Sequence, residues 1–222
     1  MRALELVQIS SAGYSQLHGL GLAERGVRVC NGLGNFDVPI AEWNLAMMVN
    51  FAHNLRGMIR NQEKGVWDRS AVFQNEIRGL TVGLWGCGGI GRETARLARA
   101  SGLTVHVLSR SGAAPRPLAC HAAGTGDPEG RLPDHLFVAG QELEFPASLD
   151  FLVLAMPLTK NTEGLVGERE LRALRPTAFV LNPARGPLIQ KQALLRALRE
   201  KWIAGAALET HHHYPMPPGH PR

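Results

Sequence analysis

A glycine-rich hexapeptide between an apolar run and a helical stretch is the feature that most constrains this chain. Residues 80–85 read LTVGLW, which is typical of a buried strand, and GCGGIG at 86–91 follows directly. The next residues, 92–100, have the composition and spacing of a helix. A strand, a tight glycine turn and a helix in this order predict a crossover unit of a parallel α/β sheet.

The glycines of the hexapeptide have separate physical roles. Gly86 permits the tight turn, Gly88 lets the backbone approach a bound diphosphate, and Gly91 lets the helix pack closely on the strand. The free N–H groups at the helix N-terminus attract an anion. We therefore predict dinucleotide binding here, with a glycine-rich turn that binds nothing as the alternative.

Strands and helices alternate along the rest of the chain. Asp37 is the expected N-cap of a long helix, with Pro39 in its first turn, and residues 111–145 are expected to form a surface excursion with one short strand. We expect strands at 4–10, 27–30, 80–85, 104–108, 136–138, 150–155, 178–181 and 203–208, and helices at 38–60, 92–100, 168–174 and 190–200. This alternation predicts an α/β fold with a doubly wound parallel sheet of the Rossmann type.

Composition narrows the classes of partner. Apolar residues make up 45% of the 222 residues and charged residues 19%, as in a globular protein. The net charge of +5 is spread over helices and loops without a nucleic-acid-binding motif, so we expect no nucleic-acid partner. No apolar run approaches the ~18 residues that span a bilayer, so we expect no membrane association. Three isolated cysteines and no signal-peptide pattern favour the cytoplasm.

Three further segments are expected at the carboxyl ends of parallel strands, where ligands bind in such sheets. They are PLTKNT at 157–162, NPARGPLI at 182–189 and AALE at 206–209. Together with GCGGIG and with SAG at 11–13, they resemble the D-isomer-specific 2-hydroxyacid dehydrogenase family. The resemblance implies a dinucleotide-binding Rossmann domain at 38–210. Residues 1–37 would be a remnant of a flavodoxin-like substrate domain, and 211–222 the start of the return to it.

The resemblance also implies roles for individual residues. Arg185 would bind the carboxylate of a small 2-oxo or 2-hydroxy acid and polarise its carbonyl group, the alternative being a surface salt bridge. Backbone amides of Ala12 and Gly13 would hold the same carboxylate. The implied cofactor-binding residues are Gly86, Gly88, Gly89, Ile90, Gly91, Ser109, Arg110, Ser111, Met156, Pro157, Thr162, Pro183, Ala184, Arg185 and Glu209. Met156 and residues 183–185 would line the nicotinamide, and Glu209 stands where the family has an aspartate.

The end of the second strand of the Rossmann domain bears on the choice of cofactor. Chains that bind NAD usually carry Asp or Glu there to hold the ribose 2′-hydroxyl. This chain has Ser109, Arg110 and Ser111 instead, and Arg110 could pair with a 2′-phosphate. We expect NADP to be preferred and NAD to remain possible. The alternative is that Arg110 stacks on adenine and both cofactors bind.

The resemblance breaks down around the proton donor. The family orients its general-acid histidine with a glutamate that precedes a proline, and Tyr214 takes that place here. The histidine belongs to a Thr-Pro-His type of segment further downstream, and the sequence ends at Arg222 before one. We therefore expect weak or absent turnover from the chain as given. The histidines at 211–213 are expected to form a solvated loop near the cleft mouth, without a metal.

Two functions are consistent with these observations. The first is an NAD(P)-dependent oxidoreductase that transfers hydride between the nicotinamide and a small acid such as glyoxylate or hydroxypyruvate. The second is a catalytically impaired dinucleotide-binding or sensor protein of the same fold, without the general-acid histidine. In either case we expect a homodimer, formed through the long helix that begins at Val38 or through an apolar face exposed by the first strands.

Overall fold

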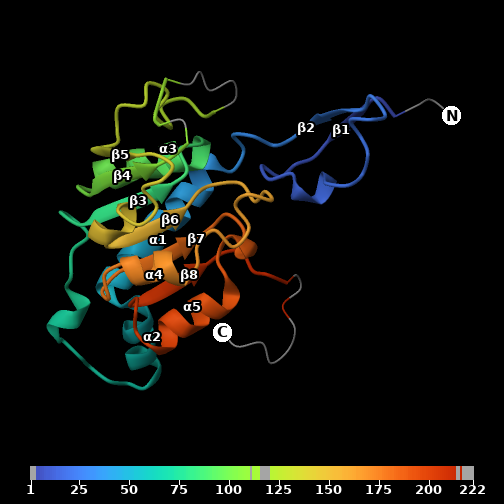
Figure 1. Cartoon of the computed structure of the whole chain (residues 1–222). Coiled ribbons are helices and arrows are strands. Elements are labelled where there is room, and N and C mark those ends of the chain that lie inside the picture. The colour runs from blue at the N-terminus through green and yellow to red at the C-terminus, as the bar shows by residue number, and fades with distance from the viewer. Residues whose placement is uncertain (1–3, 111, 116–120, 214–215, 217–222) are drawn as a thin grey trace.

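The computed structural model describes residues 4–110, 112–115, 121–213 and 216, which form two parallel β-sheets. The smaller sheet pairs β1 (Leu6–Gln8) with β2 (Arg28–Cys30) and projects from the body of the molecule (Figure 1). The larger sheet holds six strands: β3 (Thr81–Trp85), β4 (Thr104–Leu108), β5 (His135–Phe137), β6 (Phe151–Leu154), β7 (Phe179–Asn182) and β8 (Gly205–Leu208).

The six strands are ordered β5-β4-β3-β6-β7-β8, and every neighbouring pair is parallel. This is the order of a doubly wound Rossmann sheet, so the predicted fold class is confirmed. The chain leaves β3 toward one edge of the sheet and returns at β6 to build the other. Ligands bind in such sheets at this reversal, beyond the carboxyl ends of the strands.

Helices cover both faces of the sheet (Figure 1). The layer on one face contains α1 (Asp37–His53) and α3 (Gly89–Ala100), which pack against each other. The layer on the other contains α4 (Glu168–Ala173) and α5 (Lys191–Arg199). The short helices α2 (Leu55–Glu63), η1 (Ser15–Leu17), η2 (Ala71–Phe73), η3 (Phe145–Ser148) and η4 (Gly186–Leu188) complete the secondary structure.

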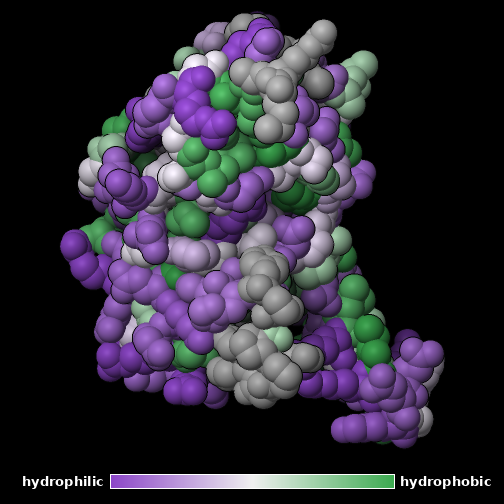
Figure 2. Space-filling model, turned by 90° about the vertical axis from the view of Figure 1, so that its right-hand side faces the viewer, coloured by the Kyte–Doolittle hydropathy of each residue, from purple (hydrophilic) through white to green (hydrophobic). Residues whose placement is uncertain are grey.

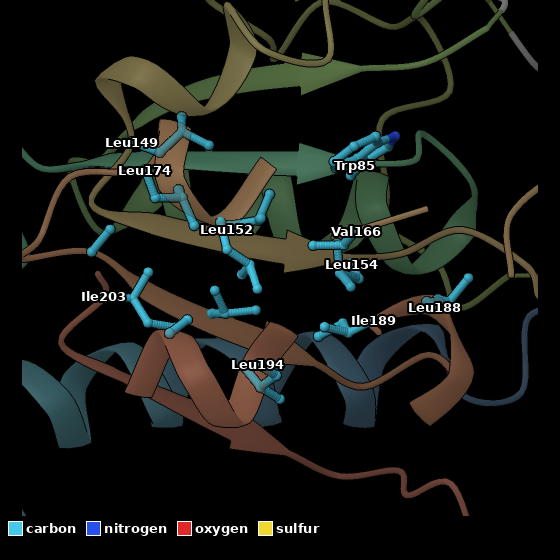
Figure 3. Close-up of a cluster of buried hydrophobic side chains, with 14 of the residues drawn as sticks. Trp85, Leu149, Leu152, Leu154, Val166, Leu174, Leu188, Ile189, Leu194 and Ile203 are labelled. Atoms are coloured by element: carbon cyan, nitrogen blue, oxygen red, sulfur yellow. The ribbon is translucent and has the colours of Figure 1, made fainter. Parts of the chain in front are cut away.

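Two apolar clusters hold these layers together. Alternate residues of a strand face opposite sides of the sheet, and β6 contributes to both clusters. Its Phe151 and Val153 pack with residues of α1 and α3, such as Met48. Its Leu152 and Leu154 pack on the α4 and α5 side, where Figure 3 shows Leu174, the residue after α4, and Leu194 of α5. Because every residue of β6 is buried, this strand is the centre of the core.

The expected helix over 38–60 is wrong, because the structure divides it in two. α1 ends at His53, and Asn54 adopts the left-handed conformation with φ 48° and ψ 48°. Asn tolerates this conformation better than most residues, and the Asn54 side chain then caps α2 by accepting from the Gly57 amide at 3.2 Å. The expected N-cap is also wrong by one residue: Phe36 is the N-cap, and Asp37 is the first helical residue.

The excursion after β4 is anchored to α3 by two buried charged side chains. Arg92 is 3% exposed and donates to the carbonyl oxygens of Cys87 at 3.2 Å, Ala114 at 2.7 Å and Asp127. Glu93, which is buried beside it, accepts from the Gly126 amide at 2.6 Å. The excursion therefore lies against the helix that follows the glycine turn. The short strand expected near 136–138 is present as β5.

Two surface regions expose apolar side chains. Figure 2 views the side from which the small sheet projects, where Leu6, Val29 and Tyr14 are exposed, as predicted for the first strands. Beyond α2, Trp67 is 87% exposed and lines a hollow of about 420 Å³ with Met58, Val66 and other residues. Among the described helices, none is both long and apolar enough to cross a membrane.

Candidate functional site

The glycine turn lies at the carboxyl end of β3, where the strand order reverses. Gly86 has φ +120°, and a methyl group there would come within 2.6 Å of the Ala155 carbonyl oxygen. A methyl group on Gly91 would overlap the carbonyl oxygen of Gly86. Both positions require glycine for backbone reasons, as the sequence predicted, because the turn, the helix and the end of β6 touch without side chains between them.

Gly88 differs from these two glycines because it faces open space. It is the N-cap of α3 with an extended backbone, and a Cβ atom there would meet nothing within 4 Å. The amides of Gly89, Ile90 and Gly91 lie in the first helical turn, where N–H groups have no partner within the helix. The geometry of the turn thus leaves room for an anion directly at the positive end of α3.

Arg185 and Gly13 are far apart in sequence and lie in loops that follow strands of different sheets, yet they are in contact. The guanidinium group lies against Gly13 so closely that a Cβ atom there would overlap Nη2. Arg185 Nη1 donates to the Ala184 carbonyl at 2.7 Å, and the described residues offer it no ion pair. The alternative of a surface salt bridge is therefore not seen among them.

The loop that carries Ala12 and Gly13 is fixed by two side chains. Ser11 Oγ donates to the Gly13 carbonyl at 2.7 Å, and Asn31 Nδ2 donates to the Ala12 carbonyl at 2.7 Å. Asn31 follows β2, so both strands of the small sheet contribute to the position of this loop. These two hydrogen bonds fix the carbonyl groups of Ala12 and Gly13, and Gly13 lies against the Arg185 guanidinium group.

Asn182 shapes the segment that presents Arg185. It is fully buried at the end of β7, and its Oδ1 accepts from the amides of Ala184 and Arg185, each at 3.2 Å. Its Nδ2 donates to the Arg185 carbonyl at 2.9 Å. The predicted cofactor-lining residues Pro183 and Ala184 lie inside this Asn-centred turn. We made no prediction for Asn182 itself, although an Asn-Pro pair at a strand end is a known turn signal.

Glu209 follows β8 on the same edge of the sheet as Arg185. Its amide donates to the Asn182 carbonyl at 3.2 Å, which ties it to the Arg185 turn. Glu209 is exposed overall, but partial desolvation of its carboxyl group raises its pKa, and the positive charge of Arg185 partly opposes that rise. The carboxyl group therefore interacts electrostatically with Arg185, and its placement near the nicotinamide stays a prediction.

Met156, Pro157 and Thr162 lie in the loop after β6, beside the glycine turn. Met156 is buried, and the Ala155 amide before it donates to the Trp85 carbonyl at 2.9 Å. Thr162 Oγ1 donates to the Pro157 carbonyl at 2.8 Å, which closes the loop into a compact turn. The segments that follow β3, β6, β7 and β8 thus carry their predicted residues to one edge of the large sheet.

Comparison with known proteins identifies the family to which this chain belongs. The profile described as D-isomer specific 2-hydroxyacid dehydrogenase, NAD binding domain, matches residues 45–222. The chain belongs to this family. It is 30% identical to a glyoxylate reductase of Thermofilum pendens over 222 residues, which covers 98% of this chain and 61% of that protein. It is 31% identical to a glyoxylate reductase of Thermococcus gammatolerans over 93% of this chain and 60% of that protein.

A solved structure of the family has the same fold. The D-isomer specific 2-hydroxyacid dehydrogenase from Xanthobacter autotrophicus Py2, in complex with NADPH and MES, superposes with a TM-score of 0.78 at 26% identity. The match covers 98% of this chain and 64% of that one. The chain thus spans about three fifths of the length of the dehydrogenases and reductases that it matches.

The structure bears differently on each of the remaining predicted residues. Ser109 and Arg110 follow β4, and Arg110 is exposed, with no hydrogen bond or ion pair to the described residues. Ser111 and Tyr214 lie outside the described residues. His213 is exposed, but His211 and His212 are half-buried and the ring of His212 lies 3.1 Å from the Ile189 carbonyl, so the loop is only partly solvated. The described residues contain no metal-ligand cluster.

Proposed function

We propose that this chain is the cofactor-binding part of an NADPH-dependent dehydrogenase that reduces small 2-oxo acids such as glyoxylate or hydroxypyruvate. The observation that carries the proposal is the contact of Gly13 with Arg185, which follows β7 at the same edge of the large sheet as the glycine turn after β3. Family membership and the names of the relatives support the reaction class. On this proposal, residues 1–37 and 211–222 belong to the substrate domain and 38–210 to the cofactor domain.

The proposed reaction assigns a separate role to the cofactor and to each residue of the site. The dihydronicotinamide of the cofactor supplies the hydride. Arg185 holds the substrate carboxylate with the backbone amides at Ala12 and Gly13, and its guanidinium group withdraws electron density from the carbonyl to be reduced. Asn182 fixes the backbone from which Arg185 extends. Tyr214 is the proposed hydrogen-bond partner of the proton donor, and its phenol orients that group without adding charge.

The cofactor is held by backbone more than by side chains. The amides at Gly89 and Ile90 face the diphosphate, and the loop after β6 lines the nicotinamide pocket through Met156. Arg110 is proposed to pair with the ribose 2′-phosphate, since it is an exposed cation without a described partner at the end of β4. We also propose a cytoplasmic homodimer, from the isolated cysteines and the exposed apolar surfaces.

Consumption of NADPH with glyoxylate or hydroxypyruvate tests the activity. Arg185→Ala is expected to lower kcat/KM by about 10²–10³-fold, because the carboxylate and the developing negative charge lose the same cation. The matched control is Arg169→Ala, which removes an exposed arginine of α4 with no hydrogen bond or ion pair to the described residues. Equal turnover by the Arg185 and Arg169 variants contradicts the assignment. Dinucleotide binding without any binding of the acid favours the sensor alternative.

The cofactor preference has its own test. Dissociation constants for NADPH and NADH are measured for the original chain and for Arg110→Ala. We expect tighter binding of NADPH, and the variant is expected to lose affinity for NADPH alone because NADH has no 2′-phosphate. Tighter binding of NADH by the original chain contradicts the preference.

A further inference from the structure

A buried carboxylate lies against the glycine turn. Asp37 is the first residue of α1 and is 8% exposed. Its side chain fills the space beside Gly89, where an added Cβ atom would overlap Oδ2. Gly89 is the first residue of α3, and α1 and α3 run side by side under the sheet (Figure 1). The carboxylate therefore lies where the first turns of two helices meet.

This position is electrostatically favourable for an anion. Each helix carries a partial positive charge at its N-terminus, and this charge attracts a carboxylate. The same first turn of α3 is the proposed site of the cofactor diphosphate, which carries two negative charges. The carboxylate and the diphosphate thus use the same positive end of α3.

We propose that Asp37 is an affinity-determining residue that weakens binding of the dinucleotide diphosphate. This inference rests on the proposed function, which places the diphosphate at residues 88–90. With Asp37 charged, the potential that the diphosphate experiences at this turn is less positive, and binding works against repulsion between like charges. Water cannot screen this repulsion fully, because the carboxylate is buried.

The experiment removes the charge and keeps the shape. Dissociation constants for NADPH, ADP and adenosine are measured for the original chain and for Asp37→Asn. NADPH and ADP are expected to bind about tenfold more tightly to the variant, and adenosine to bind unchanged because it has no phosphate. The matched control is Glu42→Gln, which removes an exposed carboxylate from the same helix and is expected to change none of the three constants.

A gain of affinity cannot arise from general damage to the fold, which makes the test specific. Asp37→Ser, which suits the first turn of a helix, is a second neutral variant if Asn at 37 does not fold, and the same gain is expected. Unchanged or weaker NADPH binding by a folded neutral variant overturns the inference, and so does an equal gain for adenosine. If neither the original chain nor the variant binds NADPH, NADH or ADP, the proposed function fails together with the inference.

Discussion

Replacing Gly86 and Gly88 by alanine, one at a time, separates the folding role of the glycine turn from its binding role. The two glycines are two residues apart in the same turn, and each mutation adds one methyl group. Their surroundings are opposite: Gly86 is enclosed by backbone, and Gly88 faces open space. We expect Gly86→Ala to lower stability and Gly88→Ala to lower cofactor affinity.

The expected loss at Gly86 has two parts. Its φ of +120° lies in a region that costs a non-glycine residue about 1–3 kcal/mol. The new Cβ would also lie 2.6 Å from the Ala155 carbonyl oxygen and 2.9 Å from the Met156 amide nitrogen. These are backbone atoms at the end of a buried strand, and displacing them costs about 1–3 kcal/mol more. The free energy of unfolding should fall by about 2–6 kcal/mol.

Gly88→Ala should leave the free energy of unfolding within about 1 kcal/mol of the original, because φ is −82° and nothing lies within 4 Å of the new methyl group. The methyl group instead enters the space that we propose for the diphosphate, so NADPH affinity should fall at least about tenfold. Urea unfolding monitored by tryptophan fluorescence and NADPH titration measure the two effects. A Gly86→Ala variant as stable as the original chain contradicts the folding role of Gly86. A Gly88→Ala variant that binds NADPH as tightly as the original chain contradicts the binding role of Gly88.

Four further outcomes follow from single side chains. Arg92→Met should lower the free energy of unfolding by about 2–4 kcal/mol in urea titrations, since three carbonyl groups lose a charged donor; an unchanged midpoint contradicts this. Asn182→Ala should lower the free energy of unfolding by about 2 kcal/mol and also lower kcat/KM. An unchanged kcat/KM would show that the turn does not position Arg185. Burial, with repulsion from a neighbouring histidine, lowers the pKa of His106, so the unfolded chain binds the proton more tightly. Stability should therefore fall as the pH drops through the ordinary value of 6.5, and His106→Gln should reduce the difference in Tm between about pH 7.5 and about pH 5.5. Trp67→Ser should shift the chain toward the monomer in light scattering if α1, α2 and the following loop form the dimer interface; a monomeric original chain contradicts the proposed homodimer.

The sheet was predictable because its strands are short apolar runs bounded by turn residues. β4 has the expected bounds, and the other strands of the large sheet lie within three residues of theirs. The break at Asn54 was not predictable from periodicity. Leu, Met and Ala continue through residues 45–58, and a left-handed Asn leaves no mark on that pattern. The left-handed backbone conformation of Asn54 determines where α1 ends.

The site was predictable where a motif carries it. The glycine turn and the Arg185 segment were found from sequence, and the structure brings Arg185 to Gly13. The supporting contacts could not be found in the same way. Arg92 and Glu93 are charged residues that a helical pattern would place on the surface, and their partners are backbone groups of an irregular segment. Asp37 meets Gly89 only because the first turns of α1 and α3 lie together in the fold, and sequence spacing does not encode that contact.

The outer strand β8 and the central strand β6 differ in how freely their sequences can change. β6 has no solvent-facing position, so each of its four residues must satisfy one of two closely packed layers. β8 leaves part of every residue accessible and is built from Gly, Ala and Leu. Natural variation along this chain should therefore be small at 151–154 and greater at 205–208, and engineering for solubility should begin at the outer strand.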